Sequence, residues 1–507
     1  MSTPTTTQAR LIGHIIDDRE MTASGEAIDR RAPGTDEIVS QVLAGGTAEV
    51  TIAVAAARKA FDSGIWPTLT VAERAIYLNR VADLIDANAE ELARLDAEES
   101  GKPITTAEGD IGGAAGLWRY AAALALTMKG QTFTGNGPDY TGLVLREPVG
   151  VVGLIIPWNF PALILSQKLP FALAAGCTAV IKPSEFTSSS AHLLVKLIAQ
   201  AGIPAGVVNL VVGDGRAGQA LTESNDVDLV SFTGSTATGR RVLAAAAGNM
   251  KKLSLELGGK AANIVFADAD LEDAAAGVVH GVIFNNGECC VSQPRLLVHE
   301  SVADEFIREV SRRMKLVRVG QPLDRDTQLG ALIHAPHLER VKSFVSSAGK
   351  HGGDVITGGD TPVGANLGNG QFIAPALIDN IAADAPIFQE EIFGPVLGVT
   401  RFTDAADAIR LANGVQYGLA NTIWSKNTDT VLDVAKALKS GTVYVNTTID
   451  APAQMPFGGY KASGIGREMG EAGFEEFTEL KSVSIRTGKR VHTFPGGLTD
   501  TNREGVA

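Results

Sequence analysis

Cysteine is the residue this chain has least of, and its scarcity argues against one class of protein. Only Cys177, Cys289 and Cys290 occur among 507 residues, and two of the three are adjacent. Secreted domains that depend on disulfides carry many spaced cysteines, and adjacent cysteines are a poor basis for such a framework. The polar N-terminal residues contain no basic segment followed by an apolar one, so we expect no signal peptide. We expect a protein of the reducing cytoplasm.

The chain also lacks a long hydrophobic run and an excess of positive charge. Its longest apolar stretch, residues 151–165, is interrupted by Pro157, Asn159 and Pro161, which excludes a membrane span. Its 44 Lys and Arg stand against 57 Asp and Glu, a net charge of -13. Nucleic-acid phosphates require a basic surface. We therefore expect neither a membrane nor a nucleic acid as partner.

Three short motifs carry side chains suited to covalent catalysis. Residues 284–290 read Phe-Asn-Asn-Gly-Glu-Cys-Cys and offer a thiol, the best side-chain nucleophile near neutral pH. Residues 255–260 read Leu-Glu-Leu-Gly-Gly-Lys, and the carboxylate of Glu256 can activate a water molecule. Residues 157–161 read Pro-Trp-Asn-Phe-Pro, where Asn159 between two stiffening prolines can donate to an oxyanion. Cys177 lies outside these motifs, and we expect it to fill packing space.

Short β-rich runs alternate with helical runs from residue 150 to residue 266. The β-rich runs lie at 151–156, 179–182, 207–212, 229–233 and 262–266, and the helical runs include 163–175, 188–201 and 238–247. This alternation predicts a doubly wound, mostly parallel sheet. A second α/β pattern covers roughly 267–460, with strands near 294–298, 395–401 and 442–446. Residues 133–149 read as a hairpin-like insertion, and residues 483–485 as a lone strand without a local partner.

Two glycine-marked turns compete as a phosphate-binding site in the first α/β pattern. Residues 213–218 match the fingerprint Gly-x-Gly-x-x-Gly directly after an apolar run, but the acidic residue expected about 20 positions later is missing. Residues 234–239 form a second strand-to-helix turn, where backbone N–H groups at a helix start can meet an anion. An ordinary β–α turn explains residues 234–239 equally well. The residues alone leave this choice open.

The motifs stand in an order and at spacings that resemble the aldehyde dehydrogenase superfamily. Four further motifs share in the resemblance: Lys-Pro-Ser-Glu at 182–185, Phe-Thr-Gly-Ser at 232–235, Glu-Ile-Phe-Gly-Pro at 391–395 and Met-Pro-Phe-Gly-Gly-Tyr-Lys at 455–461. The similarity extends over roughly residues 30–485 and favours the NAD-dependent, hydrolytic, betaine-aldehyde-dehydrogenase-like branch. It implies an enzyme that oxidises an aldehyde to the carboxylic acid with NAD+. A thiohemiacetal and then a thioester would form on a cysteine, and a glutamate-activated water would hydrolyse the thioester.

The resemblance also assigns individual residues. The family places its nucleophile three residues after the motif glycine, which selects the second cysteine of the pair. The implied catalytic residues are Cys290, Glu256, Asn159, Lys168 and Glu468. The implied NAD contacts are Ile156, Pro157, Trp158, Lys182, Glu185, Gly215, Gly218, Phe232, Gly234, Ser235, Thr238, Leu257, Glu391 and Phe393. The implied substrate pocket contains Phe160, Gln167, Val291, Thr448 and Asp450, and no metal is expected.

Two acidic residues among these contacts have ordinary readings as well. The resemblance implies that Lys182 and Glu185 bind the adenosine ribose hydroxyls. It also implies that Glu391 and Phe393 bind the nicotinamide ribose and pack against the nicotinamide ring. Without the resemblance, Lys182 and Glu185 are a surface ion pair at a helix start, and Glu391 is a solvated turn residue.

The resemblance further implies the fold and the assembly. We expect an α/β protein with a doubly wound parallel-sheet NAD-binding domain, formed by residues 1–130 and 150–260, and a second α/β catalytic domain at 261–460. Residues 131–149 and 476–495 would form a small β oligomerisation arm that pairs across subunits. The protein would be a homo-oligomer, a tetramer or a dimer.

One departure from the family pattern concerns the nucleophile. Glutamine usually follows the motif glycine, and Glu288 stands there in this chain. A carboxylate directed at the thiol would oppose its ionisation, so we expect the Glu288 side chain to point away.

Two other functions and the substrate stay open. A CoA-acylating dehydrogenase transfers the acyl group to CoA, but such relatives generally lack the glutamate that Glu256 supplies. A catalytically silent structural relative is the other alternative, against which the retained Cys290 and Asn159 argue. Residues 446–456 resemble betaine aldehyde dehydrogenases, yet Gln167 and Thr448 are polar where those relatives carry aromatic residues. We expect quaternary-ammonium aldehydes to be poor substrates.

Overall fold

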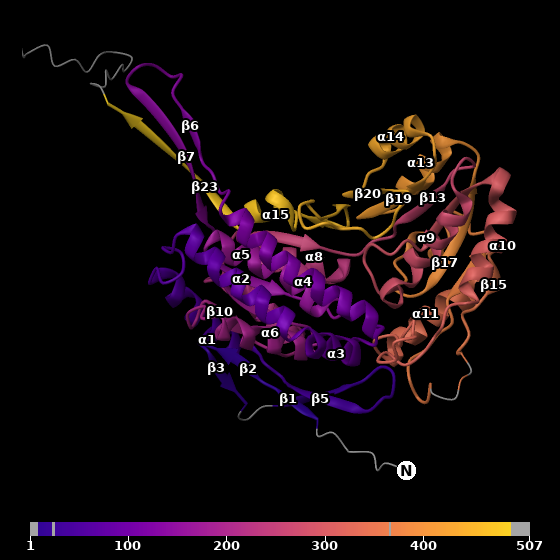
Figure 1. The fold of residues 1–507 in the computed structure, drawn as a ribbon, viewed down its shortest axis with the longest axis horizontal. Helices are drawn as coiled ribbons and strands as arrows, with labels where there is room; N and C mark the ends of the chain where they lie inside the picture. The colour runs from indigo at the N-terminus through magenta and orange to yellow at the C-terminus, as the bar shows by residue number, and fades with distance from the viewer. Residues whose placement is uncertain (1–8, 23–25, 363, 365–366, 488–507) are drawn as a thin grey trace, which may run out of the picture.

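The computed structural model describes residues 9–22, 26–362, 364 and 367–487 as two parallel-sheet bodies and a projecting β arm (Figure 1). Residues 1–8 of the expected NAD-binding domain and residues 488–495 of the expected arm lie outside the described residues.

The first sheet has eight strands in the order β22-β12-β11-β8-β9-β10-β2-β3. Its five central strands are parallel, and the strands at its edges join antiparallel. The strands are β2 (His14–Ile16), β3 (Arg19–Met21), β8 (Val151–Ile155), β9 (Thr178–Lys182), β10 (Val208–Leu210), β11 (Leu229–Thr233), β12 (Lys252–Glu256) and β22 (Gly464–Ile465). The predicted strand at 262–266 instead belongs to the second sheet, where it lies beside strands from later in the chain.

Helices cover both faces of the first sheet. Val152 and Leu154 point into a core shared with α2 to α6, whereas Val151 and Ile155 point into a core shared with α1, α7 and α8. Because both faces are buried, the strands read as continuous apolar runs. The helices are α1 (Thr47–Asp62), α2 (Val71–Ala87), α3 (Ala89–Ser100), α4 (Ile104–Ala125), α5 (Pro161–Ala175), α6 (Ser189–Gln200), α7 (Gly215–Glu223) and α8 (Thr236–Ala246).

The second sheet has seven strands in the order β15-β16-β17-β14-β13-β19-β20, all parallel except β15. They are β13 (Ala262–Val265), β14 (Arg295–His299), β15 (Asp354–Thr357), β16 (Ala376–Asp379), β17 (Val396–Phe402), β19 (Ala420–Trp424) and β20 (Thr442–Val445). Helices α9 (Leu271–Ile283) and α10 (Ala303–Met314) pack on one face, and α11 (Ala335–Ser347), α13 (Ala405–Asn413) and α14 (Thr428–Ala437) on the other.

The arm is a three-stranded antiparallel sheet that stands away from both bodies (Figure 1). It contains β6 (Gln131–Phe133), β7 (Tyr140–Pro148) and β23 (Thr478–Arg486). The strand predicted at 483–485 is longer than expected, and its partner is β7 of the same chain, in register from Thr478↔Pro148 to Arg486↔Tyr140.

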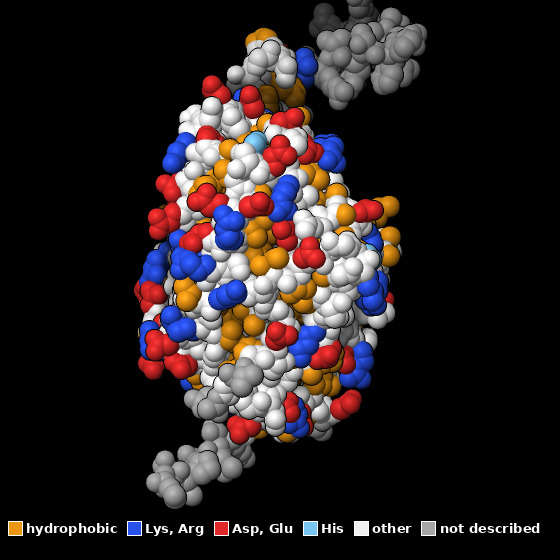
Figure 2. All heavy atoms as spheres, turned by 90° about the vertical axis from the view of Figure 1, so that its right-hand side faces the viewer, with side chains coloured by type: hydrophobic (Ala, Val, Ile, Leu, Met, Phe, Trp, Pro, Cys, Tyr) orange, Lys and Arg blue, Asp and Glu red, His pale blue; other side chains and the backbone are white. Residues whose placement is uncertain are grey.

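The remaining elements are short. They are the sheet of β1 (Arg10–Ile12), β5 (Ile38–Leu43) and β4 (Ala27–Arg31), the pair β18 (Tyr417–Gly418) and β21 (Tyr460–Lys461), helices α12 (Pro386–Gln389) and α15 (Gly470–Glu476), and the 3-10 turns η1 (Phe284–Gly287), η2 (Glu300–Val302) and η3 (Ala348–His351). Among the described helices, none is both long enough and apolar enough to cross a membrane. The outer face of the second body carries acidic and basic side chains interspersed (Figure 2).

Candidate active site

The three catalytic motifs meet at one cavity of about 480 Å³. Glu256 is the last residue of β12, and Thr233 is the last residue of β11, so the cavity lies outside the carboxyl ends of the first sheet, where α/β proteins bind ligands. Cys290 comes from the loop between η1 and β14, and Phe160 from the start of α5. Segments that are far apart in the sequence therefore bring the nucleophile and the base to one place.

The nucleophile loop owes its shape to an Asn-Asn-Gly sequence. Asn285, Asn286 and Gly287 have φ of 51°, 62° and 73°, a left-handed conformation that asparagine and glycine tolerate best. A Cβ on Gly287 would lie 2.4 Å from the Gly394 carbonyl carbon, so only glycine allows this contact. Asn286 fixes the loop further, because its Nδ2 donates to the Gly101 and Ala331 carbonyls, each at 3.0 Å.

Cys290 is half-buried, whereas Cys289 and Cys177 are buried. A hydrogen bond with the Cys289 thiol, burial and the nearby Glu256 and Glu391 charges raise the pKa of Cys290 well above its ordinary value. The thiol is therefore protonated at rest, and attack requires a change that favours the anion. Burial raises the pKa of Cys177 to about 12, which fits the packing role expected for it.

Asn159 lies directly against the nucleophile loop. Its Nδ2 donates to the Glu288 carbonyl at 3.0 Å, and Asn285 Nδ2 donates to the Asn159 carbonyl at 3.1 Å. A side-chain amide has two N–H donors, so this bond leaves Asn159 a second N–H. Asn159 itself is 5% exposed and does not line the cavity.

Glu256 is 2% exposed, and neither of its carboxylate oxygens has a hydrogen-bond partner among the described residues. Burial and then the Glu468 charge raise its pKa well above the ordinary value. Glu468 forms a buried ion pair with Lys168, whose Nζ also donates to Ser231 Oγ at 2.7 Å. The three groups implied for proton transfer therefore form one buried cluster.

Glu288 is buried and its carboxylate is bound away from the thiol. Its Oε1 accepts a hydrogen bond from the Ile333 N–H at 2.9 Å and lies 3.6 Å from His337 Nε2. Burial raises the pKa of Glu288 well above the ordinary value, so its neutral form is favoured. A neutral carboxylic acid resembles the glutamine that the family usually carries there.

The residues expected to hold the adenosine half of NAD lie at the end of β9. Lys182 is 6% exposed, and its Nζ lies 3.5 Å from Glu185 Oε2. A Cβ on Gly218 would lie 4.0 Å from the Lys182 side chain, so the turn at 213–218 borders this pair. Burial lowers the pKa of Lys182. This geometry favours the adenosine side rather than the pyrophosphate for the Gly-x-Gly-x-x-Gly turn.

The turn at 234–239 begins α8. Ser235 Oγ accepts from the Thr238 N–H at 3.2 Å, and the first N–H groups of a helix have no partner within it. Near the nucleophile loop, the Trp158 ring contacts the Phe393 ring edge-on at 5.4 Å, and Glu391 Oε1 accepts from the Gly259 N–H at 2.8 Å. The remaining expected contacts lie at the carboxyl ends of three neighbouring strands: Ile156 and Pro157 after β8, Phe232 and Gly234 at the end of β11, and Leu257 after β12.

These groups fit a dinucleotide. A half-buried carboxylate beside a buried amine suits ribose hydroxyls, and a helix start suits a pyrophosphate. The described residues contain no group of three or more His, Cys, Asp or Glu side chains placed to hold a metal ion.

The substrate pocket differs from the expectation at two residues. Phe160, Gln167 and Val291 line the cavity, but Thr448 and Asp450 do not. The Thr448 hydroxyl instead donates to Gln293 Oε1 at 2.6 Å, and Asp450 is exposed and accepts from the Thr447 hydroxyl. Asp450 makes a contact within its own loop and Thr448 contacts a distant segment, and neither contact can be read from the sequence position alone.

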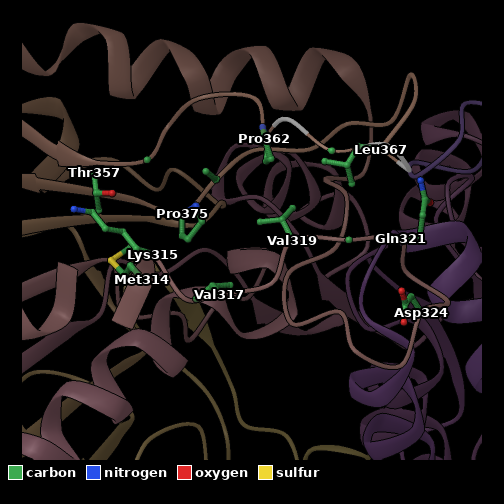
Figure 3. Close-up of a pocket in the computed structure, with 14 residues that line it drawn as sticks. Met314, Lys315, Val317, Val319, Gln321, Asp324, Thr357, Pro362, Leu367 and Pro375 are labelled. Carbon is green, nitrogen blue, oxygen red and sulfur yellow. The ribbon is translucent and has the colours of Figure 1, made fainter. Parts of the chain in front are cut away.

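A second hollow, of about 760 Å³, lies in the second body and shares no lining residue with the catalytic cavity (Figure 3). Lys315 and Asp324 are its charged residues, and its other walls include Met314, Val319 and Pro375. It combines no nucleophile with a base, so the chemistry belongs to the cavity of Cys290.

Comparison with known proteins agrees with this site. A model of the aldehyde dehydrogenase family matches residues 21–483. The chain belongs to the aldehyde dehydrogenase family. It is 42% identical to a betaine aldehyde dehydrogenase of Bacillus subtilis (strain 168) over 90% of this chain and 93% of that protein. It is also 42% identical to an aldehyde dehydrogenase of Emericella nidulans, over 90% and 91% of the two chains.

Solved aldehyde dehydrogenase structures share the fold over nearly the whole chain. An NAD-dependent aldehyde dehydrogenase from Sinorhizobium meliloti superposes with a TM-score of 0.93 at 44% identity, covering 96% of each chain. A betaine aldehyde dehydrogenase from Staphylococcus aureus, in complex with NAD+, superposes with a TM-score of 0.92 at 36% identity, covering 94% of this chain and 96% of that one.

Several functional residues of this aldehyde dehydrogenase escape sequence reasoning. A Cβ on Gly259 would lie 2.1 Å from the Cys290 carbonyl oxygen, and one on Gly458 would lie 2.7 Å from Glu256 Oε1. These glycines let backbone approach the nucleophile and the base. In the sequence these glycines are visible only as the Gly-Gly pair in each motif. The pair does not indicate which residue the backbone approaches. Gly109, Gly113 and Gly116 of α4 also line the cavity, and their helical spacing is visible in the sequence.

Proposed function

We propose that this chain oxidises an aldehyde to its carboxylic acid with NAD+ through a thioester on Cys290. One observation carries the proposal: Cys290 and Glu256 line the same cavity, and Asn159 lies against the loop that carries Cys290. A thiol, a base and an amide donor together suffice for covalent oxidation followed by hydrolysis.

The acylation half begins at Cys290. Its thiolate attacks the aldehyde carbon, and the oxyanion of the thiohemiacetal accepts hydrogen bonds from the Asn159 side chain and the Cys290 backbone N–H. Each such donor stabilises the transition state by roughly 3 kcal/mol. NAD+ supplies a positive ring that favours the thiolate and an acceptor for the hydride, whose departure leaves a thioester.

The hydrolytic half belongs to Glu256. Its raised pKa makes it a stronger base than an ordinary glutamate, and its unpartnered oxygens can bind a water molecule. Glu256 takes a proton from that water, the hydroxide attacks the thioester, and the acid leaves as the Cys290 thiol is restored. The buried Glu468–Lys168 pair adjoins Glu256 and can carry the proton onward.

Glu185 supports NAD as the cofactor. Its carboxylate can accept both ribose hydroxyls of NAD and would repel the 2′-phosphate of NADP, a charge that Lys182 offsets only in part. The NAD-binding domain would consist of residues 9–22, 26–130 and 150–260 together with strand β22. The catalytic domain would consist of residues 261–460. The NAD+ complex of the Staphylococcus aureus relative gives independent support.

The arm supports assembly into a homo-oligomer, a tetramer or a dimer. Its strands expose Phe133, Leu145, Leu480 and Ile485, which are 40–62% exposed in the single chain. Apolar side chains on a projecting sheet are typical of a surface that a second subunit covers. Three free cysteines support a reducing cytoplasm as the compartment.

The test uses two variants of adjacent residues. Cys290→Ala should abolish NADH formation from a simple aldehyde, whereas Cys289→Ala should keep most of it, because one covalent nucleophile is needed and Cys289 is buried. Identification of the product as free acid, with and without CoA, separates hydrolysis from CoA acylation. An inactive wild type, or an active Cys290→Ala variant, would overturn the proposal.

A further inference from the structure

One wall of the catalytic cavity, formed by α4, contains three glycines beside larger residues. Gly109, Gly113 and Gly116 line the cavity from one face of α4, at positions separated by four and three residues. A Cβ on Gly109 or Gly116 would meet no heavy atom within 4 Å, and one on Gly113 would meet only the end of the Leu163 side chain, at 3.3 Å. Glycine weakens a helix relative to alanine. Packing does not require glycine here, and what the three residues provide is space.

Another wall of the cavity contains two aromatic rings that are fixed in place. The rings of Phe160 and Phe284 stack with centroids 6.0 Å apart and an interplanar angle of 25°. Lys102 Nζ lies 4.1 Å from the centroid of the Phe160 ring and 2.6 Å from Asp110 Oδ2, in a buried ion pair. Phe160 is therefore held by a ring and by a cation that is itself anchored. The width of the cavity therefore depends on the side where Gly109, Gly113 and Gly116 lie.

Unpartnered polar groups show that this space is built for a ligand. Tyr444 lines the cavity and is 4% exposed, and its hydroxyl oxygen has no hydrogen-bond partner among the described residues. The Glu256 carboxylate shares these properties. Buried polar groups are normally paired, so two unpaired ones in one cavity point to a bound molecule that completes them.

The charges around the cavity exclude an anionic ligand. Its lining contains no Lys, Arg or His, and the carboxylates of Asp110 and Glu468 are each paired with a buried lysine behind the wall. A negatively charged aldehyde would face Glu256 without a compensating cation. The other walls include Ile449 and Phe457, which favour an apolar molecule.

We propose that the glycine face of α4 makes this cavity a slot for uncharged, ring-bearing aldehydes, with the ring between α4 and the Phe160–Phe284 wall. A flat substrate ring packs against aromatic side chains in offset or edge-to-face contacts. The glycine positions of α4 leave room beside the opposite face of that ring. This inference rests on the proposed function, because it assigns the substrate of the same reaction.

The experiment compares 2-naphthaldehyde with propanal in the full-length enzyme, with the acid product measured by chromatography. The wild type should have a higher kcat/KM for 2-naphthaldehyde. Gly113→Leu and Gly116→Leu should each lower the ratio of the two kcat/KM values by at least about tenfold, the effect of crowding a pocket by a few carbon atoms. Gly112→Leu is the matched control, because Gly112 lies on the same helix with open space around its Cβ and does not line the cavity. It should leave the ratio unchanged.

The outcomes separate the two proposals. If the wild type oxidises neither aldehyde, the proposed function fails. If it oxidises propanal but prefers it to 2-naphthaldehyde, or if Gly113→Leu and Gly116→Leu leave the ratio unchanged, the function stands and the glycine inference is wrong. Circular dichroism of each variant identifies a folding defect. If Gly113→Leu does not fold, a soluble and folded Gly116→Leu variant is sufficient for the comparison. An equal change in the ratio for Gly112→Leu would also contradict the inference.

Discussion

Replacing Gly259 with alanine should disable the nucleophile while most of the fold stays intact. The added Cβ would lie 2.1 Å from the Cys290 carbonyl oxygen, about 1.3 Å closer than the 3.4 Å of ordinary contact. That oxygen is backbone, so the segment that carries Cys290 must move by a similar amount. A displacement of about 1 Å at a reacting group lowers the rate by about 100-fold. Overpacking of a buried site also lowers the free energy of unfolding by about 1–3 kcal/mol.

The assay pairs steady-state kinetics with thermal unfolding. We expect Gly259→Ala to lose kcat for NADH formation far more than it loses stability. Gly112→Ala adds the same methyl group to an exposed position of α4 where no atom lies within 4 Å. It should keep kcat and gain up to about 1 kcal/mol of stability. A Gly259→Ala enzyme with wild-type kcat would refute the argument that this backbone approach positions the thiol.

The remaining predictions concern the base, the cofactor and the substrate. Glu256→Gln should retain one burst of NADH per active site but lose turnover, because acylation and hydride transfer need no water; continued turnover at the wild-type rate would remove Glu256 from the mechanism. The pKa of Glu256 is raised above 4.5, and a base works only when deprotonated, so wild-type hydrolysis should fall as the pH drops through a value well above 4.5. A profile that stays flat down to 4.5 would contradict this. The wild type should prefer NAD to NADP in kcat/KM, and Glu185→Ser should relax that preference; equal use of both cofactors by the wild type would contradict the role of Glu185. Betaine aldehyde should not exceed short aliphatic aldehydes in kcat/KM by more than about tenfold, since Gln167 lines the cavity where an aromatic cage needs a ring; a larger preference would show that the cation is held by other groups.

The three motifs that meet at the cavity could be recognised in the sequence because each depends on its immediate neighbours. Glu256 ends a buried strand and is followed by two glycines, and Cys290 follows an Asn-Asn-Gly turn that only a left-handed backbone satisfies. The central strands β8 to β11 could be predicted as well, because both faces of a parallel sheet are buried and these segments are mostly apolar, whereas β12 was not predicted. Local chemistry and local periodicity were sufficient in these places.

Features that depend on distant segments could not be predicted in the same way. Strands β2 and β22 have three and two residues, too few for a periodic pattern. Their local sequence does not indicate which edge of the sheet they join. The position of Thr448 in its loop suggested the pocket, yet the Thr448 hydroxyl contacts Gln293 from another element. The orientation of one side chain in a loop depends on contacts across the molecule, and these are absent from the local sequence.

The late strands of the chain have a consequence for how the protein is made. β22 pairs with β12 beside Glu256, and β23 forms a nine-residue ladder with β7, so both pairings join segments from opposite parts of the sequence. Contacts of such high contact order form slowly, since a long loop must close first. During synthesis the N-terminal part emerges long before residues 464–486, and its sheet edge at β12 stays unpaired until then. A ribosome-bound chain that ends before residue 464 therefore lacks the strand that pairs beside Glu256.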